Sequence, residues 1–341
     1  MVSDAVKSAR RFFNKIGFAY VVLLVAIYGS QLLAQFVALK VAGREIFDNP
    51  VFLSLATALP VDIIGAPILY LIIRKFETTK LEENKLGIGS IIKYTCMLGP
   101  ITFAGALISS GLSSLIGRIT GTVIDNNAVV ESVMQLGTVG RIITACICAP
   151  IFEELIFRKL LIDRTVKYGE AVSIVLSGVL FGLFHGNFEQ FFYACFLGMF
   201  FGYIYIKTGK IQYTMLLHFF VNFTSAAVTA SLITKFDVDA MQNLVSNEDA
   251  LQNLSSLPPE ISAMLPWFLL YTIWTLFLVL IFFAGVIFWI IELASKQRFT
   301  ERECQIPRGK ALRTVYCNPG MGLYIVLSLS LCVFVIISMM N

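Results

Sequence analysis

The sequence predicts an all-α, polytopic transmembrane helix bundle. Of the 341 residues, 57% are hydrophobic and only 14% are charged, and apolar runs of about twenty residues recur along the chain. A soluble domain carries about a quarter charged residues, whereas a bilayer core about 30 Å thick needs roughly 20 apolar residues per helix. A soluble fold is the poorer interpretation, so residues 1–341 are expected to form a single integral membrane domain.

The apolar runs predict about nine spans. Their approximate ranges are 16–39, 51–73, 94–116, 139–161, 171–186, 188–206, 211–233, 265–293 and 321–340. The first run is too long for a signal-peptide core and lacks a small-residue cleavage site, so we expect it to be retained. The longest polar connection, 234–264, is expected to contain a short amphipathic helix.

The basic residues predict the orientation of the chain. One set of alternate segments carries 21 of the 26 Lys and Arg residues, and the other set carries five. Because cytoplasmic loops carry the excess, the N-terminus is predicted to be cytoplasmic and the C-terminus outside. Lys93 and Arg141 stand at predicted span ends, from which they can extend to the interface. Basic residues at helix ends meet anionic head groups, so the expected partner is the lipid bilayer and not nucleic acid.

The cysteines predict neither a disulfide framework nor a thiolate metal site. Seven is an odd number, five of them lie inside apolar runs, and no C-x-x-C occurs. Small buried hydrophobic side chains are the better interpretation. A retained first span, no disulfide pattern and Lys-rich inside loops favour a bacterial plasma membrane, with a eukaryotic endomembrane as the alternative.

Ionisable side chains inside membrane spans are costly enough to be treated as functional candidates. Glu153, Glu154, His185, His218 and Asn222 fall in three predicted spans, and both histidines of the protein are among them. The rise of a helix places these side chains about 10 to 21 Å from the cytoplasmic span ends. They can therefore share one cavity nearer the cytoplasm than the outside.

Helical spacing gives the two glutamates different roles. Glu154 and Arg158 stand four residues apart and can form an ion pair at low dielectric. Glu153 points about 100° away from that pair. In an apolar pocket, Glu153 is suited to act as a general base.

The remaining candidates also follow a four-residue spacing. His218 and Asn222 share a helix face, and an imidazole beside an amide can donate hydrogen bonds to a developing oxyanion. His185 with Glu153 would then activate a water for attack on a peptide carbonyl. Phe181, which is four residues before His185, is expected to pack beside it.

At these residues the sequence resembles a known family. The segments EELIFR at 153–158, FGLFH at 181–185 and HFFVN at 218–222 match the patterns E-E-x-x-x-R, F-x-x-x-H and H-x-x-x-N. These are the motifs of the CAAX-protease and bacteriocin-processing family of intramembrane glutamic endopeptidases. Each motif alone is weak, but all three in this order on apolar helices are specific. The resemblance suggests a catalytic core at 138–233 with flanking helices at 1–137 and 234–341.

The resemblance implies roles for the motif residues. Glu153 and His185 would activate the water, His218 and Asn222 would form the oxyanion site, and Glu154 would support the structure together with Arg158. The implied partner is a peptide or membrane-protein substrate. The family includes peptidases of prenylated proteins and bacterial members linked to peptide maturation, bacteriocin immunity and signalling, among which the motifs do not distinguish.

Three alternatives remain open. A zinc peptidase would use His185, His218 and either glutamate, but no H-E-x-x-H occurs and Asn222 beside His218 suits an oxyanion better than a metal, so no cofactor is expected. A non-enzymatic immunity factor or scaffold would keep the fold and bind a partner without cutting it. A proton-coupled transporter would use intramembrane Glu and His as a relay, although such proteins often have repeat halves, which this sequence lacks.

Overall fold

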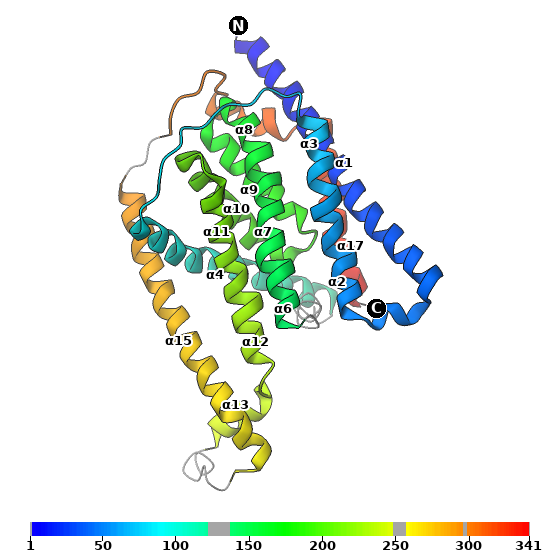
Figure 1. The fold of residues 1–341 in the computed structure, drawn as a ribbon. Coiled ribbons are helices and arrows are strands. Elements are labelled where there is room, and N and C mark those ends of the chain that lie inside the picture. Colours follow the sequence, from blue (N-terminus) through cyan, green and yellow to red (C-terminus); the bar gives the residue numbers. More distant parts are fainter. Residues whose placement is uncertain (1, 122–136, 248–256, 296–298, 341) are drawn as a thin grey trace.

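The computed structural model describes residues 2–121, 137–247, 257–295 and 299–340. Within these ranges the chain forms helices and no strand, which confirms the predicted all-α class. The helices form an elongated bundle, with α15 along one side and α1 along the other, and α4 crosses between them (Figure 1). The described part of each of the nine predicted apolar segments is helical.

Several of the long helices are composite, because α-helical turns alternate with wider π-helical turns. The N-terminal elements are α1 (Val2–Ala42), the 3-10 helix η1 (Arg44–Asp48), α2 (Pro50–Leu59), the π-helix η2 (Pro60–Gly65), α3 (Ala66–Ile73) and α4 (Ile88–Thr120). The central elements are α6 (Thr138–Arg141), the π-helix η3 (Ile142–Cys148), α7 (Ala149–Glu154), the π-helix η4 (Leu155–Leu160), α8 (Leu161–Thr165), the 3-10 helix η5 (Val166–Tyr168), α9 (Glu170–Phe184), α10 (Phe188–Thr208), α11 (Ile211–Asn222), the π-helix η6 (Phe223–Thr229) and α12 (Ala230–Ile233). The C-terminal elements are α13 (Val238–Ser246), α15 (Pro259–Ala294), the 3-10 helix η8 (Arg308–Lys310), α16 (Ala311–Val315) and α17 (Pro319–Met340).

Six helices in the described part of the chain are long and apolar enough to cross a membrane. They are Asp4–Ala42, Ile88–Thr120, Phe188–Thr208, Ile211–Ile233, Pro259–Ala294 and Pro319–Ile337. The 15 residues of α9 span about 22 Å, less than the roughly 30 Å hydrocarbon core. The run 138–165 carries six charged residues between 153 and 164. The count of nine spans therefore stays a prediction.

The basic segments gather at one end of the bundle. The N-terminus, the connection from α3 to α4 and the segment before α17 lie at the end where α8 lies, and α13 lies at the opposite end (Figure 1). The alternation of segments rich and poor in Lys and Arg along the sequence requires the rich segments to lie at the same end of the bundle. Which end faces the cytoplasm stays a prediction.

The connection at 234–264 contains the short amphipathic helix that the sequence predicts. Asp237 caps α13 by accepting a hydrogen bond from the Ala240 backbone N–H at 3.0 Å. Met241 and Leu244 are buried, and the cluster that they form includes partly buried side chains of α15. Residues 248–256 of this connection lie outside the described residues.

Of the two basic side chains at predicted span ends, Arg141 does not lie where its position suggests. Arg141 is only 3% exposed and donates a hydrogen bond to Ser231 Oγ at 2.7 Å. Lys93 forms an ion pair with Glu292 of α15 at 2.5 Å. The expectation that both side chains extend to the interface is wrong for Arg141, because α12 supplies a hydrogen-bond acceptor inside the bundle.

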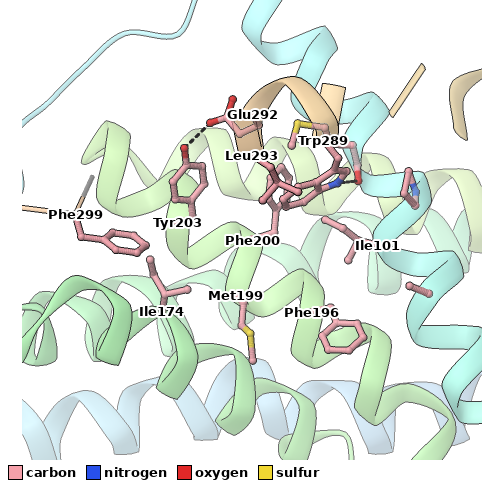
Figure 2. A pocket seen from close by; sticks show the side chains of 13 residues that line it. Ile101, Ile174, Phe196, Met199, Phe200, Tyr203, Trp289, Glu292, Leu293 and Phe299 are labelled. Atoms are coloured by element: carbon pink, nitrogen blue, oxygen red, sulfur yellow. Dashed lines mark hydrogen bonds between the residues drawn. The ribbon is translucent and has the colours of Figure 1, made fainter. Parts of the chain in front are cut away.

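A largely apolar cavity of about 680 Å³ lies between α4, α9, α10 and α15 (Figure 2). Its polar edge holds a hydrogen bond of 2.6 Å from the Tyr203 hydroxyl to Glu292. Phe200 lines this cavity, whereas the adjacent Phe201 contacts His218. Successive residues of a helix point in different directions, so the cavity and His218 lie on different faces of α10.

Candidate active site

The first motif lies where α7 passes into the π-helix η4. Pro150 stands near the start of α7, inside a composite helix, so its missing N–H removes one backbone hydrogen bond of that helix. Glu154 ends α7 and Arg158 lies inside η4, and both side chains are 0% exposed. π-Helical turns are rare and are frequent at functional sites, and here one follows directly after the paired glutamates.

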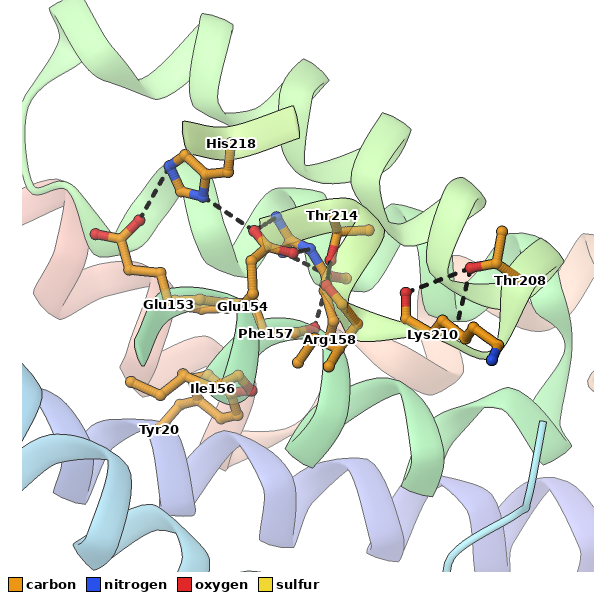
Figure 3. Close-up of polar contacts among 12 residues, drawn as sticks. Tyr20, Glu153, Glu154, Ile156, Phe157, Arg158, Thr208, Lys210, Thr214 and His218 are labelled. Atoms are coloured by element: carbon orange, nitrogen blue, oxygen red, sulfur yellow. Dashed lines mark hydrogen bonds and ion pairs between the residues drawn. The ribbon is translucent and has the colours of Figure 1, made fainter. Parts of the chain in front are cut away.

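Glu154 and Arg158 form the ion pair that the four-residue spacing predicts. Arg158 Nε lies 2.9 Å from Glu154 Oε2, and Nη2 donates to Oε1 at 3.0 Å (Figure 3). A two-point contact of this kind fixes the orientation of the carboxylate as well as its charge. Breaking such a buried pair leaves one uncompensated charge.

Three further side chains hold the guanidinium of Arg158. Nη1 donates to Ser177 Oγ at 3.1 Å, and the Ser177 hydroxyl in turn donates to the Phe157 carbonyl at 2.8 Å. The rings of Phe181 and Phe201 lie 4.8 and 5.5 Å from the guanidinium carbon. Cation–π contacts stabilise a desolvated Arg, so α9 and α10 both help to fix the ion pair.

His218 lies between the two glutamates. Its Nδ1 is 3.1 Å from Glu154 Oε1, and its Nε2 is 3.6 Å from Glu153 Oε2 (Figure 3). Glu154 accepts from Arg158 as well, so Nδ1–H of His218 is the donor to the same carboxylate. The sequence analysis assigned Glu153 and His185 jointly to water activation, and in the structure Glu153 also faces His218.

His185 caps the C-terminal end of α9. Its Nδ1 lies 2.9 Å from the carbonyl oxygen of Phe181, one turn earlier. The chain then turns through Gly186, whose φ of 64° is left-handed and favours glycine. A carbonyl only accepts, so Nδ1 carries the proton and Nε2 of the neutral ring has a lone pair available.

The ring of Phe181 contacts both histidines. The ring centroids lie 4.9 Å apart for His185 and 5.8 Å for His218, in edge-to-face geometry. Packing beside His185 was expected. The contact with His218 brings the second and third motifs together through one aromatic ring.

Asn222 joins α11 to the helix that carries the glutamates. Its Nδ2 donates to the carbonyl oxygen of Ala145, in the π-helix η3, at 2.7 Å. One N–H of the amide is used in this bond, and the second stays available for another acceptor. Asn222 is also the last residue of α11, one turn beyond His218.

Several supporting residues lie outside the three motifs. Ser177 stands one turn before Phe181, so helical spacing from the second motif points to it. Phe201 and Tyr20 come from other helices, and the Tyr20 hydroxyl donates to the Ile156 carbonyl inside η4 at 3.0 Å (Figure 3). No sequence spacing relates Tyr20 to residue 156.

The acidic and imidazole groups do not converge as metal ligands do. His218 directs its two nitrogens to two different carboxylates, whereas the ligands of a metal point to a single centre. Among the described residues, no three His, Cys, Asp or Glu side chains form a group able to hold a metal ion.

Comparison with known proteins places the site in a known family. The model of the family described as "Type II CAAX prenyl endopeptidase Rce1-like" matches residues 135–224. No curated protein and no solved structure matches the chain. The matched segment covers about a quarter of the sequence and contains all three motifs, so the resemblance seen in the sequence is confirmed. The segment 135–224 thus matches the model of the Rce1-like family, which consists of CAAX-type membrane proteases.

Proposed function

We propose that this protein is an intramembrane glutamic endopeptidase that hydrolyses a peptide bond of a membrane-associated protein or peptide without a metal. The observation that carries the proposal is the position of His218, which lies between Glu153 and Glu154 while Arg158 fixes Glu154. All of these residues lie in the segment that matches a protease family. The retained first span and the Lys-rich loops favour a bacterial plasma membrane as its location.

Glu153 and His185 activate the attacking water. The Phe181 carbonyl fixes the His185 tautomer, so Nε2 can accept a hydrogen bond from the water. Glu153 takes the proton as general base while the water oxygen bonds to the carbonyl carbon. Glu153 then returns this proton to the leaving amine nitrogen when the C–N bond breaks.

His218 and Asn222 stabilise the oxyanion of the tetrahedral intermediate. Asn222 has a second amide N–H besides the one bound to Ala145. His218 Nδ1 faces Glu154, and its Nε2 points away from that carboxylate, on the side of Glu153, where an N–H on Nε2 can donate to the oxyanion. N–H donors placed before the reaction cost no reorganisation when the negative charge develops.

Glu154, Arg158 and Phe181 support the site and take no part in proton transfer. Glu154 orients the His218 ring, and Arg158 balances the charge of Glu154 in a buried environment. Phe181 packs against both imidazoles and the guanidinium. The ion pair therefore acts on the reaction through His218.

Cleavage by a Glu153→Gln variant tests this function. The substitution keeps the shape of the side chain and removes the base, so processing of co-expressed candidate peptides and membrane proteins should be lost at an unchanged protein level. Glu77→Gln is the control, because Glu77 is exposed and pairs only with Lys167 among the described residues. Processing or protection that survives Glu153→Gln would favour the immunity or scaffold function instead.

Metal analysis tests the zinc alternative separately. The glutamic mechanism predicts that purified protein retains its activity after dialysis against a chelator. If each chain holds one tightly bound zinc, and the chelator removes both the zinc and the activity, then a metal-bound water would be the nucleophile and Glu153 and His185 would not be the water activators.

A further inference from the structure

A basic hollow lies at the N-terminal end of α1, where the chain enters α17. It has a volume of about 310 Å³ and is lined by Lys7, Arg10, Arg11, Asn14, Asn318 and Pro319. Three of these six residues are cationic and none is acidic. The hollow therefore concentrates positive charge on one concave surface.

The three cations lack the acidic partners that other basic side chains have. Elsewhere Lys167 pairs with Glu77 at 2.7 Å and Lys210 pairs with Glu83 at 3.2 Å. Within the described part of the chain, no carboxylate lies at ion-pairing distance from any of the three cations that line the hollow. Their charge is thus available to a ligand.

Hydrogen bonds hold one wall of the hollow in place. Arg10 donates to the Cys317 carbonyl from Nε at 3.0 Å and from Nη2 at 2.6 Å. Asn14 Oδ1 accepts from the Gly320 backbone N–H at 2.8 Å, and Asn318 Oδ1 accepts from the Met321 N–H at 3.0 Å. The bonds of Arg10 and Asn14 join the basic face of α1 to the start of α17, and the bond of Asn318 caps the first turn of α17, whose positive helix end adds to the same field.

The backbones of α1 and α17 approach closely just below the hollow. A Cβ at Gly320 would lie 2.8 Å from the Phe18 backbone nitrogen, so no larger residue fits there. Phe18 is 43% exposed, and Leu323, three residues beyond Gly320, is 41% exposed. An apolar surface therefore begins where the basic hollow ends.

We propose that this hollow binds the phosphate head group of an anionic phospholipid, with the acyl chains on the adjoining apolar surface of α1 and α17. The charge of the three cations suits a phosphate, and basic pockets between transmembrane helices bind anionic head groups. The exposed Phe18 and Leu323 select a lipid over free phosphate, because only a lipid covers them. This site is independent of the proposed peptidase activity.

Native mass spectrometry of the full chain in detergent tests the proposal. Phosphatidylglycerol and phosphatidylcholine of equal chain length are added to wild type and to Lys7→Gln, Arg11→Gln and the double variant. Wild type is expected to hold one phosphatidylglycerol in preference to phosphatidylcholine. Each removed charge is worth about 1 kcal/mol near a lipid surface, so the double variant should bind phosphatidylglycerol about thirtyfold more weakly.

Two controls decide whether the effect belongs to this hollow. Lys15→Gln removes the same charge from an exposed position of α1 that does not line the hollow, and it should leave the affinity unchanged. Lys7→Arg keeps the charge and should retain binding. Equal weakening by Lys15→Gln, no preference between the two lipids, or displacement of the lipid by inorganic phosphate would each overturn the proposal.

Discussion

Arg158 shows how one buried cation can organise a site. It is 0% exposed, and it contacts a carboxylate, a hydroxyl and two aromatic rings from three helices. Replacing Arg158 by Met leaves Glu154 buried without its counter-ion. We expect a loss of about 3–5 kcal/mol in the free energy of unfolding, measured by denaturant unfolding in detergent micelles.

The neighbouring Lys159 provides a matched control. It pairs with Asp163 at the same four-residue spacing, but its side chain is 52% exposed. An exposed pair contributes about 0–1 kcal/mol, so Lys159→Met should unfold almost as wild type does. If the two variants lose equal amounts of unfolding free energy, the buried Glu154–Arg158 pair stabilises the protein no more than the exposed Lys159–Asp163 pair does.

Asn222 separates a catalytic role from a structural one. If its amide stabilises the oxyanion, Asn222→Ala should lower kcat by about 10²–10³-fold with little change in KM. Ser225→Ala is the control, because Ser225 is exposed, lies three residues further along the helix, and donates to the Val221 and Asn222 carbonyls of the same composite helix. A loss of stability with an unchanged kcat would show instead that the bond from Asn222 to Ala145 only joins two helices.

The residue-level predictions succeeded where the interaction is local. The contact of Glu154 with Arg158 lies within one helical turn, so the sequence spacing fixes it. The contact of Glu153 with His218 depends on how α7 and α11 are placed relative to each other, which motif spacing does not determine. The sequence therefore placed these side chains in one cluster, but it did not indicate that Glu153 would face His218.

At the scale of elements, the π-helix η4 depends on helices outside the family segment. The hydroxyl of Tyr20, from α1, donates to the Ile156 carbonyl. Tyr20→Phe leaves this carbonyl buried with one partner fewer, so we expect a loss of about 1–3 kcal/mol in stability. We also expect a lower kcat, because η4 positions Arg158.

Tyr324→Phe is the control, because it removes a similar bond, to the Leu180 carbonyl at 2.9 Å. It should lower stability but not kcat. Equal kcat values for the two variants would exclude a positioning role of Tyr20.

The contact between α9 and α10 depends on glycine. A Cβ at Gly178 would lie 2.6 Å from the Cys195 carbonyl oxygen and 2.8 Å from the Met199 backbone nitrogen. Backbone atoms cannot move aside as a side chain can, so Gly178→Ala should cost about 1–3 kcal/mol in the free energy of unfolding. Gly111→Ala in α4 is the control. It meets no atom within 4 Å and should be neutral or slightly stabilising, since Ala favours helices; a stable Gly178→Ala variant would contradict this packing.

At the scale of the whole molecule, composition predicted the class and left the number of spans open. Hydropathy identifies apolar helices such as α15 and α17, because most of their side chains can face lipid. It leaves α9 open because this apolar helix is short, and it identifies the run 138–165 less securely because this run carries buried polar residues of the site. Their partners inside the bundle offset the cost of that polarity, and hydropathy does not take such partners into account.

The orientation of the whole chain can be tested with its own cysteines. Cys304 and Cys317 are exposed and belong to the segment that precedes α17, at the basic end of the bundle. We expect a membrane-impermeant maleimide to label them only after the cells are permeabilised. Ser246→Cys, on the exposed surface of α13, should be labelled in intact cells when Cys304 and Cys317 are replaced by Ser.

Labelling of Cys304 in intact cells would mean that the chain has the opposite orientation to the predicted one. Both proposals would then change. The hollow lies between the start of α1 and the start of α17, at the end of the bundle where the N-terminus and the segment before α17 lie. A reversed chain would place the hollow away from the anionic cytoplasmic leaflet, which attracts each Lys or Arg by about 1 kcal/mol. It would also place Glu153 nearer the outside, so that substrates would have to enter from that side. Labelling only after permeabilisation would instead place the head-group site and the nearer entrance to the catalytic residues on the cytoplasmic face.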